Sequence, residues 1–136
     1  MELSQQDYEL IESAKQTYER LYLKDVHEVA AAVRTASGDI FTGIHIEADV
    51  GFADVCGEVA AVCVMVNAGR RDLLTVVAIS GSSPNDLEIL APCGRCREVI
   101  KDFNPNAWVI VGAIEQPYKV TVSELLPLHS KMSEVN

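Results

Sequence analysis

Apolar residues recur at helical spacing through residues 4–22, the first patterned segment of the chain. This spacing places them on one face of a helix with about 3.6 residues per turn. Ser4 stands before the pattern, and serine is a favoured N-cap residue. We therefore predict an amphipathic helix whose apolar stripe is formed by Leu10, Ile11, Ala14, Tyr18, Leu21 and Tyr22.

Strand patterns follow this helix. Residues 28–35 and 39–47 flank the turn sequence Ala-Ser-Gly-Asp, which predicts a β-hairpin. Residues 73–80, LLTVVAIS, form a continuous apolar run, which is typical of a strand covered on both faces. Residues 87–90 and 107–113 are two further predicted strands, so the chain offers five strands for one sheet.

Helical segments separate the later strands. We predict helices over residues 54–67, with Asp54 as the candidate N-cap, over residues 93–103, and over residues 121–127. Strands joined by helical crossovers run parallel, whereas a hairpin is antiparallel. The pattern predicts a single α/β domain over residues 1–136, a three-layer α/β/α sandwich around a central mixed five-stranded sheet.

The composition limits where the protein works. Its first residues, MELSQQDYEL, contain neither a basic segment nor an apolar core, so we expect no secretory signal. No apolar run approaches the roughly 18 residues that span a bilayer, so we expect no membrane association. We therefore expect a cytoplasmic protein, where thiols stay reduced and the four cysteines are free to act as ligands, nucleophiles or core residues.

The formal net charge of −9 argues against polyanionic partners. Nucleic-acid-binding proteins gain most of their affinity by neutralising phosphates with a basic surface. The only basic clusters here are the short pairs Arg70-Arg71 and Arg95-Arg97. We therefore expect no nucleic acid partner, and a small molecule fits the charge better.

Three of the cysteines are placed to share a metal ion. Cys93 and Cys96 lie three residues apart, so one helical turn brings both sulfurs to one side, and Cys56 can supply a third ligand. Cys63 is the candidate fourth ligand, but seven helical residues separate it from Cys56 by about 10.5 Å. Two thiolates on one zinc ion lie only about 4 Å apart. We therefore expect Cys63 to be a packing residue and the metal site to keep an open position.

A glutamate and a proline extend the cysteine pattern. Glu58 stands two residues after Cys56, and Pro92 directly precedes Cys93. C-x-E followed by P-C-x-x-C is the signature of the zinc deaminases. The chain more widely resembles the small homo-oligomeric cytidine deaminases: EVAAAVRTASGDIFTGIHIE is similar to their first hairpin, CGEVAAV to their C-A-E helix, PCGRCRE to their P-C-G-x-C-R-Q segment, and TVSELLP to their end.

This resemblance implies a function for each member of the pattern. It implies that Cys56, Cys93 and Cys96 bind Zn²⁺ and that Glu58 is the catalytic proton shuttle. A zinc-bound hydroxide would attack C4 of a cytosine ring, Glu58 would protonate N3, and ammonia would leave. The resemblance also implies a nucleoside-like substrate and a homo-oligomer, a tetramer with active sites at subunit contacts.

Four residues are the expected substrate contacts. The family's N-x-E motif, whose Asn and Glu hold the ribose, falls on His45-Ile46-Glu47, so Glu47 is kept and His45 replaces Asn. His27 stands where the family has an aromatic residue in the base pocket, and Gly57 stands where it has Ala. Both histidines are equally compatible with ordinary polar strand positions.

Three thiolates on Zn²⁺ leave a formal charge of −1, which a positive group should offset. Family members with three cysteines often carry an arginine where this chain has Val59. Arg95 or Arg97 can take over this role, as in the blasticidin S deaminases, which share CGRCR; both can equally be solvated helix residues.

Three functions remain open at this point. The first is a zinc-dependent hydrolytic deaminase of cytidine, deoxycytidine or a close analogue. The second keeps the chemistry but acts on a nucleoside antibiotic of the blasticidin S type, which Ser4-Gln5, FTG and CGRCR favour. The third is a non-catalytic binding module that zinc only stabilises, which Glu58 and the missing fourth ligand disfavour.

Overall fold

The computed structural model describes residues 1–130, so the last residues of the predicted domain, 131–136, lie outside the described part. The elements in chain order are α1 (Gln5–Leu21), β1 (Val29–Thr35), β2 (Ile40–Ile44), the 3₁₀ turn η1 (Gly51–Ala53), α2 (Gly57–Asn67), β3 (Leu73–Ser83), β4 (Asp86–Leu90), α3 (Gly94–Phe103), β5 (Trp108–Ala113), β6 (Gln116–Thr121) and α4 (Val122–Leu125).

The strands form one mixed sheet in the order β2-β1-β3-β5-β6, and β4 pairs with β3 off this path. Among the strands of residues 1–130, only β3 and β5 run parallel, and every other pairing is antiparallel. The sheet therefore holds six strands rather than five. The additional strand is β6, a mostly polar segment that pairs with β5 at the edge of the sheet.

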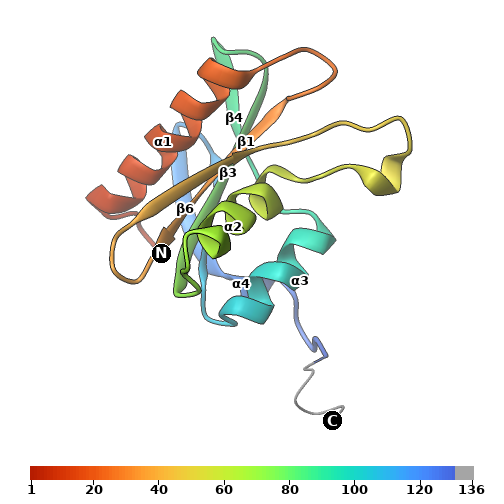
Figure 1. The fold of residues 1–136 in the computed structure, drawn as a ribbon. Helices are drawn as coiled ribbons and strands as arrows, with labels where there is room; N and C mark the ends of the chain where they lie inside the picture. Colours follow the sequence, from red (N-terminus) through yellow and green to blue (C-terminus); the bar gives the residue numbers. More distant parts are fainter. Residues whose placement is uncertain (131–136) are drawn as a thin grey trace.

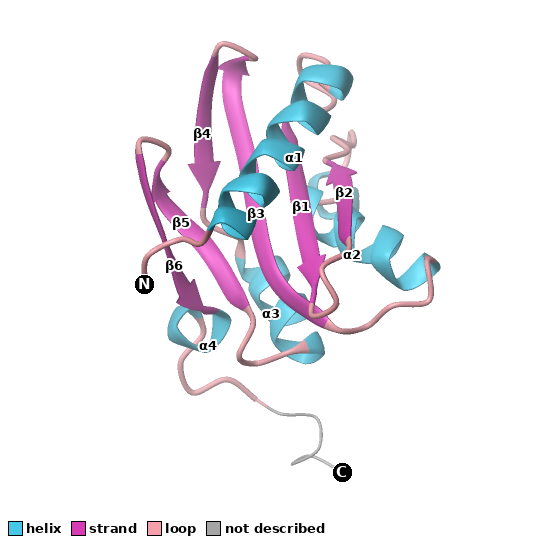
Figure 2. Cartoon of the chain, turned by 90° about the vertical axis from the view of Figure 1, so that its left-hand side faces the viewer, coloured by secondary structure: helices cyan, strands magenta, loops and turns pink. Residues whose placement is uncertain are grey.

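Helices cover both faces of the sheet, which confirms the predicted three-layer α/β class (Figures 1 and 2). Neighbouring strand residues point to opposite faces. On one face, α1 packs on Ala32, Val77, Ile79 and Ile110. On the other face, α2 and α3 pack on residues of alternate position: Ala31, Val33, Val76, Ala78, Val109 and Val111.

The first helix begins as its sequence predicts. The Ser4 hydroxyl accepts a hydrogen bond from the Asp7 backbone N–H, and the Asp7 carboxylate accepts one from the Ser4 backbone N–H. Asp7 is fully buried and also pairs with Arg34 of β1 (3.1 Å) and Lys119 of β6 (2.8 Å). One carboxylate thus links α1 to two strands of the sheet.

Close packing of α2 on β2 fixes the position of the N-terminus of α2, where Cys56 and Glu58 lie. A Cβ added at Gly43 of β2 would lie 2.2 Å from the backbone nitrogen of Ala61 in α2. Only glycine permits this approach, because no side chain separates the two backbones. The loop between β2 and α2, which carries η1, extends away from the sheet (Figure 1).

Candidate metal centre

The N-termini of two helices, α2 and α3, lie side by side, and each helix begins directly after a cysteine. Cys56 is the N-cap of α2 and Cys93 is the N-cap of α3, and neither thiol caps its own helix with a hydrogen bond. Asp54, the predicted N-cap, instead accepts a hydrogen bond from the Ala48 backbone N–H (2.7 Å) and closes the preceding loop. Both thiols are therefore free to face a ligand.

The three predicted cysteines come together in one triangle. The sulfur of Cys93 lies 3.5 Å from that of Cys56 and 3.6 Å from that of Cys96. All three sulfurs lie within 4.8 Å of one another. Tetrahedral zinc with Zn–S bonds of about 2.3 Å separates its sulfurs by about 3.8 Å, so the triangle has the size that zinc requires.

The triangle has no fourth ligand among residues 1–130. No other His, Cys, Asp or Glu of this part joins the three cysteines at metal-ligand distance. Cys63, the excluded candidate, is exposed on α2 and lies outside the group. Its exposure differs from the buried packing position that the sequence predicts. Three protein ligands and one open position are the arrangement of catalytic rather than structural zinc.

Glu58 lies in the first turn of α2 beside the thiols, and only 6% of its surface is exposed. Burial raises the pKa of Glu58, although its backbone N–H and the Cys96 thiol offset part of this effect. Its carboxylate is not a member of the ligand group. A buried carboxylate next to a metal, but not bound to it, can carry protons near neutral pH.

The thiols differ in their environment. Burial raises the pKa of Cys56 and of Cys96, and the neighbouring Glu58 and thiols add to the effect in Cys96. Burial acts in the same direction on Cys93, but hydrogen bonds from the Cys96 backbone and the adjacent thiols lower its pKa overall. Without a cation, burial keeps two of these three thiols protonated. A metal cation is the partner that converts such a group to thiolates.

Two arginines of α3 hold the segments that carry the cysteines. Arg95 donates to the carbonyl oxygens of Asp54 (2.7 Å) and Phe52 (3.4 Å), just before Cys56. Arg97 donates to the carbonyl oxygens of Pro92 (2.8 Å) and Leu125 (3.0 Å). Both guanidinium groups are thus fixed near the cluster through backbone oxygens. The N-termini of α2 and α3 add further positive potential.

A cavity of about 150 Å³ opens beside the thiols. It brings together five of the eight predicted site residues, Cys56, Cys93, Glu58, Gly57 and His45. Cys96 is buried behind them, whereas His27 and Glu47 do not line this cavity. Three residues that were not predicted complete the wall: Val29, Leu90 and Ala91. Leu90 and Ala91 directly precede the P-C-x-x-C motif.

His45 connects the cavity to the two remaining predicted residues. Its Nε2 atom lies 3.0 Å from a carboxylate oxygen of Glu47, and its backbone oxygen lies 2.8 Å from Nδ1 of His27. Glu47 and Asp54 bring two carboxylates within 4.8 Å of the His45 ring nitrogen. One rim of the cavity is therefore rich in hydrogen-bond acceptors.

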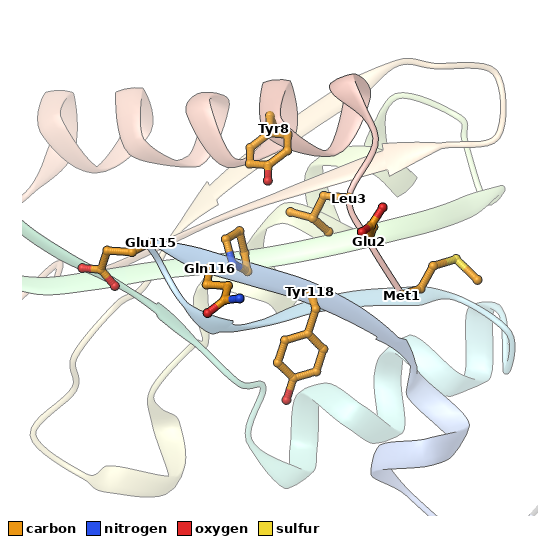
Figure 3. Close-up of a pocket in the computed structure, with 8 residues that line it drawn as sticks. Met1, Glu2, Leu3, Tyr8, Glu115, Gln116 and Tyr118 are labelled. Carbon is orange, nitrogen blue, oxygen red and sulfur yellow. The ribbon is translucent and has the colours of Figure 1, made fainter.

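A larger cavity, of about 690 Å³, lies at the N-terminal segment (Figure 3). Its wall is formed by Tyr8 of α1, the first three residues of the chain, Glu115 of the β5–β6 turn and the first three residues of β6. Its wall contains no cysteine or histidine, whereas Cys56, Cys93, Glu58 and His45 all line the smaller cavity. Although it is larger, this cavity is therefore not the candidate reactive site; the cavity beside the thiols is.

The chain matches known proteins over most of its length. Residues 4–112 match the family described as cytidine and deoxycytidylate deaminase zinc-binding region. The chain is 38% identical to blasticidin-S deaminase of Bacillus cereus over 93% of both proteins. It is 31% identical to cytidine deaminase of Halalkalibacterium halodurans over 87% of this chain and 89% of the relative.

Solved structures agree with these matches. The cytidine deaminase from Burkholderia pseudomallei superposes with a TM-score of 0.78 and 25% identity, covering 94% of this chain and all of that protein. The family match and the thiol triangle together confirm the predicted zinc cofactor. Among the helices of residues 1–130, none has the length and apolar character that a membrane crossing needs.

Proposed function

Because the chain belongs to the zinc-binding family of cytidine and deoxycytidylate deaminases, we propose that it hydrolytically deaminates a cytosine nucleoside. The observation that carries this proposal is the open thiol triangle with buried Glu58 beside it in one cavity. Cys56, Cys93 and Cys96 would hold the zinc ion. When bound, zinc supplies Lewis acidity that makes water a nucleophile at neutral pH.

Glu58 would move the protons of the reaction. Its carboxylate takes a proton from the attacking water and delivers it to N3 of the cytosine ring. The water oxygen bonds to C4 while the bond from C4 to the exocyclic nitrogen breaks. The two protons of water end on N3 and on the departing ammonia, so the products are a uracil nucleoside and ammonia.

Burial fits Glu58 for this task. A carboxyl group with a raised pKa holds a proton more readily near neutral pH and releases it to a weakly basic ring nitrogen. Its position in the first turn of α2 directs it to the side of the cavity where the thiols lie. Val29 and Gly57 belong to the wall against which the ring would lie, and a Cβ at Gly57 would come within 3.0 Å of the Val29 backbone oxygen.

Two substrates of this class are candidates, and a different observation favours each. The acidic position of the N-x-E motif, which a sugar hydroxyl would contact, is kept as Glu47. This favours cytidine or deoxycytidine. The higher identity to blasticidin-S deaminase, and His45 in place of Asn, favour a larger nucleoside antibiotic of the blasticidin S type. A binding module without catalysis is disfavoured, because the family is one of aminohydrolases.

The test is a panel of ammonia-release assays on the zinc-loaded protein. Cytidine, deoxycytidine, free cytosine and blasticidin S are compared at equal concentration, with adenosine as the control for a different ring. We expect release from at least one cytosine nucleoside and none from adenosine. One bound zinc per chain without ammonia from any of these compounds would contradict the proposal.

We further propose that the protein is a homotetramer. Helix α2 carries no charged residue after Glu58, and an apolar groove of about 430 Å³ runs between it and α3. Phe52, 83% exposed, stands on the loop that extends from the sheet. Covering these surfaces with further copies would remove apolar area from water. Light scattering of the purified protein measures this directly, and a monomer would contradict it.

The proposal also includes two expectations on organisation and location. Residues 1–136 would form one domain, since both packing layers share a single sheet. Thiolate ligands require reduced cysteines, so a reducing compartment such as the cytoplasm suits the protein.

A further inference from the structure

Three hydrogen bonds join four neighbouring residues at the rim of the cavity. The backbone N–H of Glu28 points to Nδ1 of the His45 ring at 3.2 Å. Nε2 of the same ring lies 3.0 Å from Oε2 of Glu47. Nδ1 of His27 lies 2.8 Å from the backbone oxygen of His45. The chain of contacts thus runs from the hairpin segment through His45 to the exposed carboxylate of Glu47.

The backbone partners determine where each ring carries its proton. A backbone N–H can only donate, so Nδ1 of His45 must accept and has no hydrogen. The ring is then neutral, and its single proton is on Nε2, where it is donated to Glu47. A backbone carbonyl can only accept, so His27 must carry its proton on Nδ1. The backbone therefore makes Nδ1 an acceptor in His45 and a donor in His27.

The surrounding backbone fixes this arrangement. The His45 N–H donates to the Val29 oxygen (2.8 Å), and the Glu47 N–H donates to the Val26 oxygen (3.0 Å). The side chain of His45 is only 14% exposed, whereas that of Glu47 is 49% exposed. The ring is consequently held in place, and the carboxylate that it contacts faces solvent at the rim.

We propose that His45 is a positioning residue that aims the carboxylate of Glu47, so that the sugar end of the substrate is recognised through a hydrogen-bond donor. This inference rests on the proposed function and specifies its substrate. The only ring proton of His45 is used on Glu47, so the ring offers a ligand no second donor. A carboxylate has several acceptor positions, and His45 occupies only one.

The charges at this rim add to the preference for a donor. Asp54 and Glu47 both lie within 4.8 Å of the His45 ring nitrogen, and within residues 1–130 neither forms an ion pair with lysine or arginine. Arg95, the basic residue that contacts this loop, donates to backbone oxygens of Asp54 and Phe52. Both a hydroxyl and a protonated amine supply the required donor, and the amine adds charge complementarity.

Nuclear magnetic resonance of the ring nitrogens tests the arrangement without reference to activity. The chain has only three histidines, so single His→Gln variants assign the ¹⁵N signals of each ring. At mildly alkaline pH we expect His45 protonated on Nε2 and His27 protonated on Nδ1. A His45 ring protonated on Nδ1 would overturn the proposal, whether or not the protein deaminates cytidine.

Kinetics of three variants test the positioning role. Glutamine can place an N–H near the position of Nε2, so H45Q should retain KM within a few-fold, whereas H45A should raise KM by about 10- to 100-fold with little change in kcat. H129Q is the matched histidine control, since within residues 1–130 the His129 ring forms its one hydrogen bond with the Leu126 backbone oxygen, outside the cavity. A fall in kcat alone for H45A, or an H45Q variant as impaired as H45A, would overturn the role.

Substrate analogues distinguish the two kinds of donor. The 2′- or 3′-hydroxyl of cytidine is removed, replaced by an amine, or methylated so that it only accepts. We expect removal and methylation at one position to raise KM, and the amine to preserve or lower it. Equal KM values for hydroxyl and methoxy analogues at both positions would overturn donor recognition. Blasticidin S is assayed alongside, and if it alone releases ammonia, the H45A and H45Q comparison is made with it. Absence of ammonia from every analogue and from blasticidin S would instead refute the proposed function.

Discussion

Replacing Glu58 by glutamine separates proton transfer from every other property of the site. Glutamine has the same shape, and the thiol triangle does not include the Glu58 carboxylate. The variant should therefore keep its zinc and its fold. Its amide cannot take a proton from water or give one to ring N3. We expect substrate to bind and ammonia release to be lost.

The size of the loss follows from the work assigned to Glu58. Transfer of one proton by a positioned side chain contributes about 10²–10⁴ in rate, or about 2.7–5.4 kcal/mol at 1.36 kcal/mol per tenfold change. In the proposed mechanism Glu58 serves both the water and the ring, and its 6% exposure leaves little access for bulk water to replace it. We therefore expect kcat to fall by at least about 10⁴-fold for E58Q.

The assay measures ammonia release and zinc content on the same samples. Glu9→Gln is the matched control, because Glu9 is exposed on α1, which packs on the face of the sheet opposite to α2 and α3. The control should match the original protein in both measurements. E58Q with full zinc and kcat within tenfold of the original would refute Glu58 as the proton carrier.

Four further substitutions test other parts of the structure. Cys56→Ser should abolish stoichiometric zinc binding, whereas Cys63→Ser should leave zinc content unchanged, and loss of zinc from the latter variant would place Cys63 in the site. Arg95→Met should weaken zinc affinity, measured by competition with a chelator, because the loop before Cys56 loses its link to α3; unchanged affinity would show that this link does not position the ligand. Asp7→Ala should lower the free energy of unfolding in urea by about 3–5 kcal/mol at neutral pH, because it leaves Arg34 and Lys119 without their buried partner. Burial alone raises the pKa of Asp7, but hydrogen bonds from Lys119 and Ser4 lower it overall, so this difference should shrink as pH falls below about 3.9, the value in unfolded chains. A difference that does not change with pH would contradict the charge-based explanation.

The metal centre could be predicted from the sequence because local geometry encodes most of it. Cys93 and Cys96 share one helical turn, and the distance along α2 excludes Cys63 from the same ion. Glu58 follows Cys56 within the first turn of α2. Only the approach of the two helix N-termini depends on distant parts of the chain, and the resemblance to a known family supplied it.

Elements that depend on distant partners could not be predicted. Strand β6 has the polar sequence QPYKVT with an internal proline, a weak strand pattern whose ladder with β5 forms only in the folded sheet. Strand β3 continues past residue 80, where the apolar run ends, and residues 81–83 pair with the start of β4, which leaves only Pro84 and Asn85 between the two strands. Their bulged register is not visible in the sequence.

The side-chain contacts at the rim of the cavity could not be predicted from the sequence either. Asp54 has the residue type of an N-cap, but its carboxylate bonds to the Ala48 N–H, and α2 begins three residues later. His27 and His45 occupy the expected register, yet which ring nitrogen is protonated depends on the backbone groups of Glu28 and His45. Side-chain roles at this rim follow from packing of the hairpin rather than from residue type.

The most direct test of the account is ammonia release by one preparation in three states: zinc-loaded, stripped by chelator, and reloaded. With cytidine and blasticidin S as substrates, we predict that release with at least one of them follows zinc content up to one ion per chain. Release should vanish on stripping and return on reloading. Activity that persists in the stripped protein, or a fully loaded protein that releases no ammonia from either compound, would contradict the assignment of a zinc-dependent cytosine nucleoside deaminase.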